Sequence, residues 1–273
     1  MKTITLIIEG MMCQNCCSHV DKALNGISGV AANVSLEEKK GEFIAIMGPS
    51  GCGKSTIIRI IDDIIKPTNG TITVDGYVYD NNKEISKEVI QKLGFIFQVP
   101  NLYPWLTIRE NIMLPLKIHK LKGEQYEKKA DDLLAYVGLQ KYADSYPNEI
   151  SGGMSQRIGV IRAMIHNPQI LMMDEPFGAL DEDTRETLNV ELVKIWRDTG
   201  MTIIFITHNI EEAVLLSQRV YVMSSHPGQV KTELTIDFGE KERDLDLLSD
   251  PKFAQYCTQI EQLIGHLALD EIK

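Results

Sequence analysis

The stretch GPSGCGKST, at residues 48–56, decides the fold. It matches the pattern Gly-x-x-x-x-Gly-Lys-Ser of a phosphate-binding loop, in which glycines let backbone N–H groups turn toward nucleotide phosphates at the start of a helix. We expect the Lys54 ammonium to reach the β- and γ-phosphates and the Ser55 hydroxyl to bind Mg²⁺. The loop residues expected to contact the nucleotide are Gly48, Pro49, Ser50, Gly51, Cys52, Gly53, Lys54, Ser55 and Thr56.

The segments on either side of this loop have the structure that such a loop requires. GEFIAIMG (41–48) predicts a buried strand before it, and KSTIIRIIDDII (54–65) predicts a helix after it. GTITVDGYVYD (70–80) predicts an antiparallel hairpin with its turn at Asp75 and Gly76. Further short apolar runs are typical of the buried centre of a parallel sheet, and they are GFIFQ, QILMMDE, MTIIFITH and RVYVMSS. The sequence therefore predicts an α/β fold of the P-loop NTPase type.

Composition excludes several classes of protein. The chain has 273 residues, 44% of them hydrophobic, and its formal net charge of -10 argues against a surface that binds nucleic acid. No run approaches the roughly 18 to 20 apolar residues of a membrane span, and the start MKTITLIIEG lacks the features of a signal peptide. Five cysteines, three of them in CQNCC at 13–17, do not suggest a secreted disulfide framework. We therefore expect a cytoplasmic protein.

Two carboxylates follow the predicted strand in ILMMDEP. The end of a strand in a parallel sheet is where α/β proteins bind ligands, so Asp174 is expected to hold Mg²⁺ and Glu175 to polarise the attacking water. An Asp-Glu pair alone could also be an ordinary helix cap. Together with the phosphate loop, the pair indicates phosphoryl transfer.

The chain resembles the ATP-binding cassette (ABC) ATPases over about residues 34–238. SGGMSQR at 151–157 is similar to the signature motif of that family, and Gln98, GALD and His208 stand in the expected order around it. The resemblance implies an ABC-type parallel core sheet, an antiparallel β subdomain and a helical subdomain. The expected divisions of the chain are an N-terminal β-α-β segment at 1–38, an ABC ATPase domain at 39–240 with a helical subdomain at about 100–165, and a C-terminal helical tail at 241–273.

The resemblance also implies roles for residues outside the phosphate loop. The signature helix would bind the γ-phosphate held by the other subunit, so ATP would be sandwiched in a homodimer. Gln98 resembles the glutamine that contacts Mg²⁺ and senses the membrane partner, Asp181 lies in the loop that crosses the dimer interface, and His208 resembles the switch histidine on the γ-phosphate. The signature residues expected to contact ATP are Ser151, Gly152 and Gly153. The residues expected to act in hydrolysis are Lys54, Gln98, Glu175 and His208.

A narrower resemblance points to one branch of importers. NLYPWLTIRENI at 101–112, DEPFGALD and MSSHPGQV are similar to the ATPases that serve nitrate, sulfonate, taurine or bicarbonate importers. This predicts membrane permease subunits as partners, no nucleic acid, and a position at the inner face of the cell membrane. Trp105 and Leu106 either pack within the helical insertion or dock a permease helix. The alternatives are a non-transport ABC ATPase, which usually needs paired cassettes or a long coiled-coil insertion, and a fusion protein with impaired activity.

The N-terminal stretch resembles a different family. GMMCQNC at 10–16 is similar to the heavy-metal-associated (HMA) domain, of which residues 1–38 would supply a β-α-β half of the ferredoxin-like module. Cys13 and Cys16 are then expected to bind Cu(I) or Zn²⁺ as thiolates. No aromatic residue precedes Phe43, so the ring on which ABC ATPases usually stack adenine is missing. We expect ATP binding to be weaker by roughly threefold to tenfold for this reason.

Overall fold

The computed structural model describes residues 2–9, 31–38, 41–224, 228–239 and 241–270. Its strands form a six-stranded sheet in the order β10-β9-β3-β8-β7-β6 and a four-stranded sheet in the order β2-β1-β4-β5. The strands are β1 (Lys2–Glu9), β2 (Ala31–Glu38), β3 (Phe43–Met47), β4 (Asn69–Val74), β5 (Tyr77–Asp80), β6 (Leu93–Ile96), β7 (Ile170–Asp174), β8 (Thr202–Ile206), β9 (Arg219–Ser224) and β10 (Gln229–Thr235). The helices are α2 (Lys54–Ile61), α3 (Lys87–Ile90), α4 (Ile108–Ile118), α5 (Glu124–Tyr136), α6 (Gly152–Met164), α7 (Glu182–Thr199), α8 (Ile210–Leu216) and α9 (Pro251–Asp270), with 3-10 turns at Gln140–Tyr142, Pro147–Glu149 and Leu245–Ser249.

The six-stranded sheet is the centre of the molecule. Its strands are parallel except for β10, which pairs antiparallel with β9. Both faces of β3 are buried: Phe43, Ala45 and Met47 pack into one hydrophobic cluster with residues of α7 and α8, and Ile44 and Ile46 pack into another with residues of α2 and β4. Because side chains alternate between the faces of a strand, a run that is apolar throughout fits only a sheet covered on both sides. The predicted parallel α/β core is confirmed.

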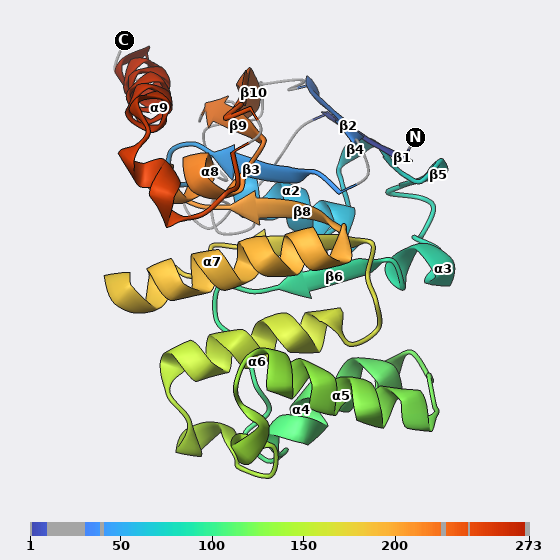
Figure 1. The fold of residues 1–273 in the computed structure, drawn as a ribbon. Coiled ribbons are helices and arrows are strands. Elements are labelled where there is room, and N and C mark those ends of the chain that lie inside the picture. The colour runs from blue at the N-terminus through green and yellow to red at the C-terminus, as the bar shows by residue number, and fades with distance from the viewer. Residues whose placement is uncertain (1, 10–30, 39–40, 225–227, 240, 271–273) are drawn as a thin grey trace.

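The segment between β6 and β7 forms a helical layer. Helices α4, α5 and α6 share a hydrophobic cluster of their own, and Figure 1 shows them below α7, on the side away from the four-stranded sheet. Residues Val160, Ala163 and Met164 of α6 also pack into the core that contains α7. The segment between β6 and β7 is therefore helical, and it is packed against the core through α6.

The four-stranded sheet contains the predicted hairpin. Asp75 and Gly76, at the turn between β4 and β5, have φ angles of 53° and 78°, the left-handed pair that a two-residue hairpin of type I′ requires. Strand β1 pairs antiparallel with β4, with Ile4 opposite Val74. The N-terminal strand is thus part of the sheet that packs on α2.

Strands β1 and β2 do not pair as expected for the β-α-β half of an HMA module. The two strands are antiparallel neighbours, with Lys2 opposite Glu38 and Glu9 opposite Ala31. A β-α-β crossover joins parallel strands, so the structure does not show the ferredoxin-like HMA half expected for residues 1–38. Residues 10–30, with the predicted helix, lie outside the described residues.

Candidate nucleotide site

The phosphate loop connects β3 to α2, as predicted. Gly48 has a φ of 152°, and a Cβ atom there would lie 2.6 Å from the Met223 carbonyl oxygen on the neighbouring strand, so only glycine fits. The Lys54 ammonium is buried and donates to the carbonyl oxygens of Gly48 at 2.9 Å and Pro49 at 3.0 Å. Ser50 and Gly51 are exposed at the tip of the loop. The loop therefore surrounds its lysine and presents its tip to solvent.

Cys52 lies beneath this loop. Its side chain is buried, and burial raises the pKa of the thiol even though the Lys54 charge opposes that effect. The Cys52 sulfur is 3.8 Å from the Lys54 nitrogen. Cys52 is therefore a neutral, small packing residue at the base of the loop.

The two predicted Mg²⁺ ligands meet at the end of β7. The Ser55 hydroxyl donates to Oδ1 of Asp174 at 2.6 Å, and Asp174 is buried. Arg59, one turn further along α2, binds Oδ2 of the same carboxylate at 2.9 Å. Hydroxyl and carboxylate oxygens are hard ligands of the kind Mg²⁺ prefers, so the residues present fit the ion. The sequence predicted Ser55 and Asp174, while Arg59 escaped notice because nothing in the motif marks it.

Glu175, directly after β7, faces His208, which follows the end of β8. Oε2 of Glu175 is 3.4 Å from Nδ1 of His208, and the Glu175 N–H donates to the Ile206 carbonyl at 3.0 Å. Glu175 has a φ of 45°, a left-handed conformation that is unfavourable for residues with a side chain and is often found at functional sites. The predicted base and switch histidine are thus brought together, with the base held in a strained backbone.

A buried polar network lies behind this pair. The Thr207 hydroxyl donates to Glu212, and Nε of Arg185 lies 3.5 Å from the same carboxylate. Burial raises the pKa of Glu212, and the hydrogen bond from Thr207 and the charge of Arg185 oppose that rise. Since Thr207 precedes His208 directly, the network fixes the backbone from which the histidine projects.

The signature residues lie in a separate pocket. Ser151 caps α6 by accepting from the Met154 N–H at 3.3 Å, and it lines a pocket of 530 Å³ that also contains Gly152, Gly153 and Asp181. Asp181 caps α7 by accepting from the Thr184 N–H at 3.0 Å, and this bond lowers the pKa of its carboxyl group. No phosphate-loop residue lines this pocket. The phosphate loop and the signature residues, which are expected to contact ATP from opposite sides, therefore lie at different places on one chain.

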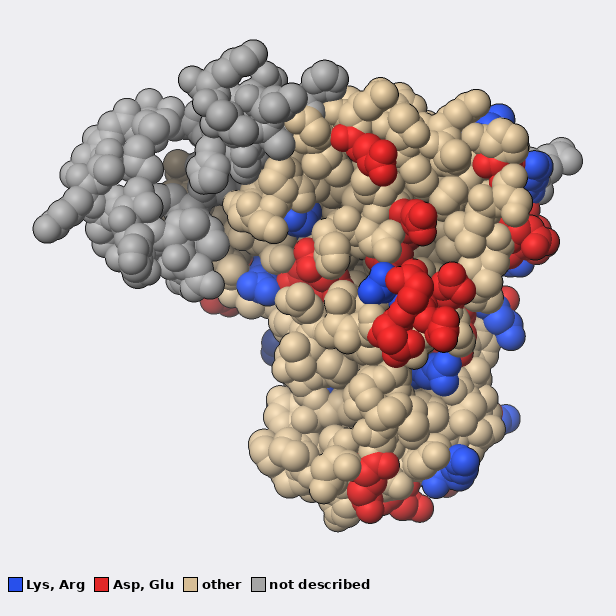
Figure 2. All heavy atoms as spheres, turned by 90° about the vertical axis from the view of Figure 1, so that its left-hand side faces the viewer, with Lys and Arg blue, Asp and Glu red and all other residues tan. Residues whose placement is uncertain are grey.

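Acidic side chains gather on the side of the molecule at which the parallel strands of the six-stranded sheet end. In Figure 1 the arrowheads of β3, β6 and β8 point to the left, and Figure 2 views that side, where Asp and Glu side chains gather in the middle. This agrees with the formal net charge of -10.

Gln98 is held by a residue that sequence reasoning missed. The Gln98 side chain is exposed, and its backbone carbonyl accepts from Nε2 of Gln156 at 3.2 Å. The same buried amide donates to the carbonyl of Pro176, directly after Glu175. The guanidinium of Arg162, two turns further along α6, donates to the Asn101 carbonyl at 3.0 Å. The signature helix therefore holds both the Gln98 segment and the segment that follows Glu175.

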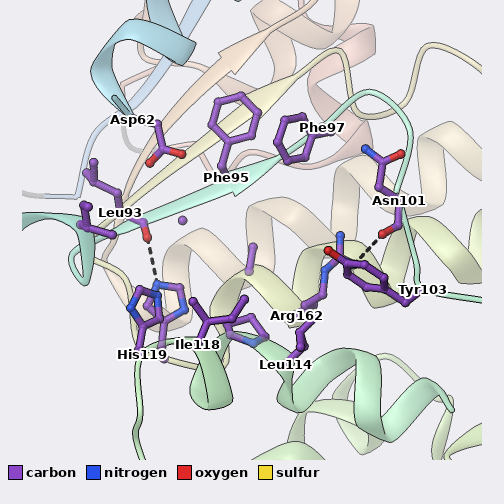
Figure 3. Close-up of a pocket in the computed structure, with 15 residues that line it drawn as sticks. Asp62, Leu93, Phe95, Phe97, Asn101, Tyr103, Leu114, Ile118, His119 and Arg162 are labelled. Carbon is purple, nitrogen blue, oxygen red and sulfur yellow. Dashed lines mark hydrogen bonds between the residues drawn. The ribbon is translucent and has the colours of Figure 1, made fainter. Parts of the chain in front are cut away.

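An apolar groove lies between β6 and the helical layer. It has a volume of 290 Å³, and Figure 3 shows Phe95 and Phe97 on one wall, facing Ile118 and Arg162 on the other. Trp105, nearby along the chain, is 68% exposed, so it does not merely pack within the helical layer. The groove opens next to the segment that carries Gln98.

The predicted copper ligands, Cys13 and Cys16, lie outside the described residues. Within the described ranges, no group of three or more His, Cys, Asp or Glu side chains is arranged to hold a metal ion. Among these same residues, no helix combines the length and the apolar character needed to cross a membrane.

Comparisons with known proteins agree with this geometry. A family model described as ABC transporter matches residues 31–178. The chain is 39% identical to the nitrate import ATP-binding protein NrtD of Synechocystis sp. over 237 residues, covering 85% of this chain and 86% of that protein. It is 36% identical to the taurine import ATP-binding protein TauB of Jannaschia sp., with 94% of each chain covered.

A solved structure gives the same result at the level of the fold. The dimeric, post-hydrolysis structure of the ATP-binding cassette MJ0796 bound to ADP and Pi is 33% identical, with a TM-score of 0.68 over 86% of this chain and 100% of that one. The chain belongs to the ABC transporter family, and it is an ATPase of that family.

Proposed function

We propose that this chain is the ATP-hydrolysing subunit of an importer for small anions of the nitrate, taurine and sulfonate kind. It acts as a homodimer on membrane permease subunits, at the inner face of the cell membrane. The observation that carries the proposal is the arrangement at the strand ends: Ser55 with Asp174, and Glu175 with His208. The names of the relatives, import ATP-binding proteins for nitrate and taurine, support the class of solute.

The residues divide the work of hydrolysis. The phosphate loop and Lys54 hold the β- and γ-phosphates, and Ser55 and Asp174 hold Mg²⁺, which when bound compensates the charge of the phosphates. Glu175 accepts the proton of the attacking water, and His208 orients Glu175 and contacts the γ-phosphate. Since no aromatic residue precedes Phe43, ATP binds roughly threefold to tenfold more weakly than it would with a stacking ring.

The dimer completes each site. Ser151, Gly152 and Gly153 would reach the γ-phosphate of the partner subunit, because their pocket contains no phosphate-loop residue of the same chain. Asp181, in the same pocket, would line the interface. In this arrangement Gln98 couples the binding of nucleotide in the site to the permease.

Removing the base tests the hydrolytic assignment. We expect Glu175→Gln to lower turnover by about 10²- to 10⁴-fold, the usual contribution of a general base, and to accumulate an ATP-bound dimer. Turnover is measured by phosphate release, and the dimer by size-exclusion chromatography with ATP. The matched control is Glu186→Gln, an exposed glutamate on α7. Undiminished hydrolysis in Glu175→Gln would remove Glu175 from the role of base.

The groove beside β6 is the proposed permease contact. Its aromatic wall, together with exposed Trp105 and Tyr103, suits an apolar helix end of a membrane protein. The test reconstitutes the chain in vesicles with the permease and binding protein of a taurine, sulfonate or nitrate importer. We expect ATP-driven uptake, and its loss in Trp105→Ala while basal hydrolysis by the isolated subunit is retained. Co-purification with RNA or DNA in place of a permease would favour a non-transport ABC ATPase.

A narrower proposal concerns Cys13 and Cys16. The CQNC spacing and the resemblance to HMA domains support Cu(I) binding by these two thiolates. A Cu(I) titration against a competing chelator compares the protein with its Cys13→Ser, Cys16→Ser variant. Equal binding by both proteins would mean that the motif holds no site.

A further inference from the structure

Two residues of one helix hold the Asp174 carboxylate. Ser55 Oγ donates to Oδ1 at 2.6 Å and Arg59 donates to Oδ2 at 2.9 Å. Ser55 and Arg59 are four residues apart on α2, so they lie one above the other on the same face of the helix. With both oxygens bound, the plane of the carboxylate is fixed.

The hydrogen bond from Ser55 also orients the hydroxyl. Because its proton is directed to Asp174, the oxygen keeps its lone pairs for a metal ion. Ser55 therefore presents its oxygen to Mg²⁺ before the ion arrives, whereas Arg59 occupies the second carboxylate oxygen.

Arg59 is also the cation next to Asp174. The Asp174 side chain is only 4% exposed, whereas Arg59 is 40% exposed and reaches in from the surface. The Lys54 ammonium is directed elsewhere, to the carbonyls of Gly48 and Pro49. In the described part of the chain, Arg59 is thus the side chain that forms an ion pair with this carboxylate.

We propose that Arg59 is a positioning residue that serves as the resident counter-ion of Asp174. When no metal ion is bound, its charge balances a carboxylate that is buried at the end of β7. When Mg²⁺ is bound, the same charge opposes that of the ion, so Arg59 lowers the affinity of the site for Mg²⁺ and favours release of the ion with the product. The inference rests on the proposed assignment of Ser55 and Asp174 to Mg²⁺.

The experiment compares Arg59→Met, which keeps the length of the side chain but not its charge, with Arg59→Lys, which keeps the charge. The first readout is the Mg²⁺ concentration that half-saturates binding of a fluorescent ADP analogue. We expect Arg59→Met to lower that concentration by about tenfold, because a repelling charge is gone, and Arg59→Lys to stay within about threefold of the parent protein. The second readout is the Tm in EDTA without nucleotide. We expect Arg59→Met to lose about 5 °C there, and to recover most of this loss with Mg²⁺ and ADP.

Each result has a defined meaning. An unchanged or raised Mg²⁺ requirement in Arg59→Met overturns the counter-ion role, as does a Tm loss that Mg²⁺ and ADP leave untouched. If Arg59→Met does not fold, Arg59→Gln, which retains a hydrogen-bond donor without the charge, replaces it under the same expectations. If the parent protein itself binds ADP with no dependence on Mg²⁺, the assignment of Ser55 and Asp174 fails, and this outcome is distinct from a failure of Arg59 alone.

Discussion

Asp62, which caps the C-terminal end of α2, should make the stability of the fold depend on pH. Burial, and secondarily the charge of Asp63, raises the pKa of Asp62 from 3.8 to about 7. The folded chain therefore holds a proton that the unfolded chain releases, and stability present below pH 3.8 is lost as the pH rises from 3.8 to about 7. At about 1.36 kcal/mol per pKa unit this difference corresponds to about 4 kcal/mol at most, and because water reaches part of the side chain we expect about 1–2 kcal/mol.

The substitution Asp62→Asn removes this titration. We expect the variant to exceed the parent protein in free energy of unfolding by about 1–2 kcal/mol at pH 8, and to come close to it near pH 4, where folded Asp62 is protonated and the unfolded aspartate is about half protonated. Urea unfolding followed by circular dichroism at pH 4, 6 and 8 measures this difference. The control is Asp132→Asn, on the exposed face of α5, which should show no such dependence. A stability difference that does not change with pH, or a less stable variant at pH 8, would refute the reasoning.

Three other substitutions test contacts around the site. Gln156→Glu removes both N–H groups that donate to the carbonyls of Gln98 and Pro176. Losing these two hydrogen bonds costs about 2–4 kcal/mol in holding the two segments in place, and we expect kcat, measured by phosphate release, to fall tenfold or more. Lys129→Met removes the ammonium that binds the carbonyls at the end of α6, where Lys129 Nζ lies 2.9 Å from the Met164 carbonyl oxygen. The free energy of unfolding, measured in urea, should fall by about 1–3 kcal/mol while ATP affinity is retained. Gly48→Ala places a Cβ atom 2.6 Å from the Met223 carbonyl and should abolish binding of a fluorescent nucleotide, with normal binding in this variant contradicting the loop geometry.

The parts of the site that could be predicted are those with a local cause. A phosphate loop has a fixed pattern between a strand and a helix, and Asp174 and Glu175 follow an apolar run that can only be a buried strand. The turn at Asp75 and Gly76 was predictable for the same reason, since these residues tolerate the left-handed backbone that a two-residue hairpin needs.

The missed features depend on contacts between distant segments. The alternation of Thr and apolar residues in β1 predicts a strand but not which strands lie beside it. The antiparallel pairing of β1 with β2 and β4 could therefore not be predicted from the local sequence. Gln156 touches carbonyls 58 and 20 residues away, and Arg59 meets a carboxylate 115 residues further on. The left-handed backbone of Glu175, with a φ of 45°, likewise has no signal in the residues next to it in the sequence.

The antiparallel pairing of β1 and β2 has a consequence for how this chain can vary. Because Glu9 lies opposite Ala31, the ends of the connecting segment are neighbours in space, whatever number of residues joins them. The entropy of closing such a connection grows only with the logarithm of its length, and doubling the length costs about 0.6 kcal/mol. Residues can therefore be inserted, exchanged or removed between these two strands at little thermodynamic cost to the nucleotide site, which makes this connection a natural place to graft an additional peptide onto the ATPase.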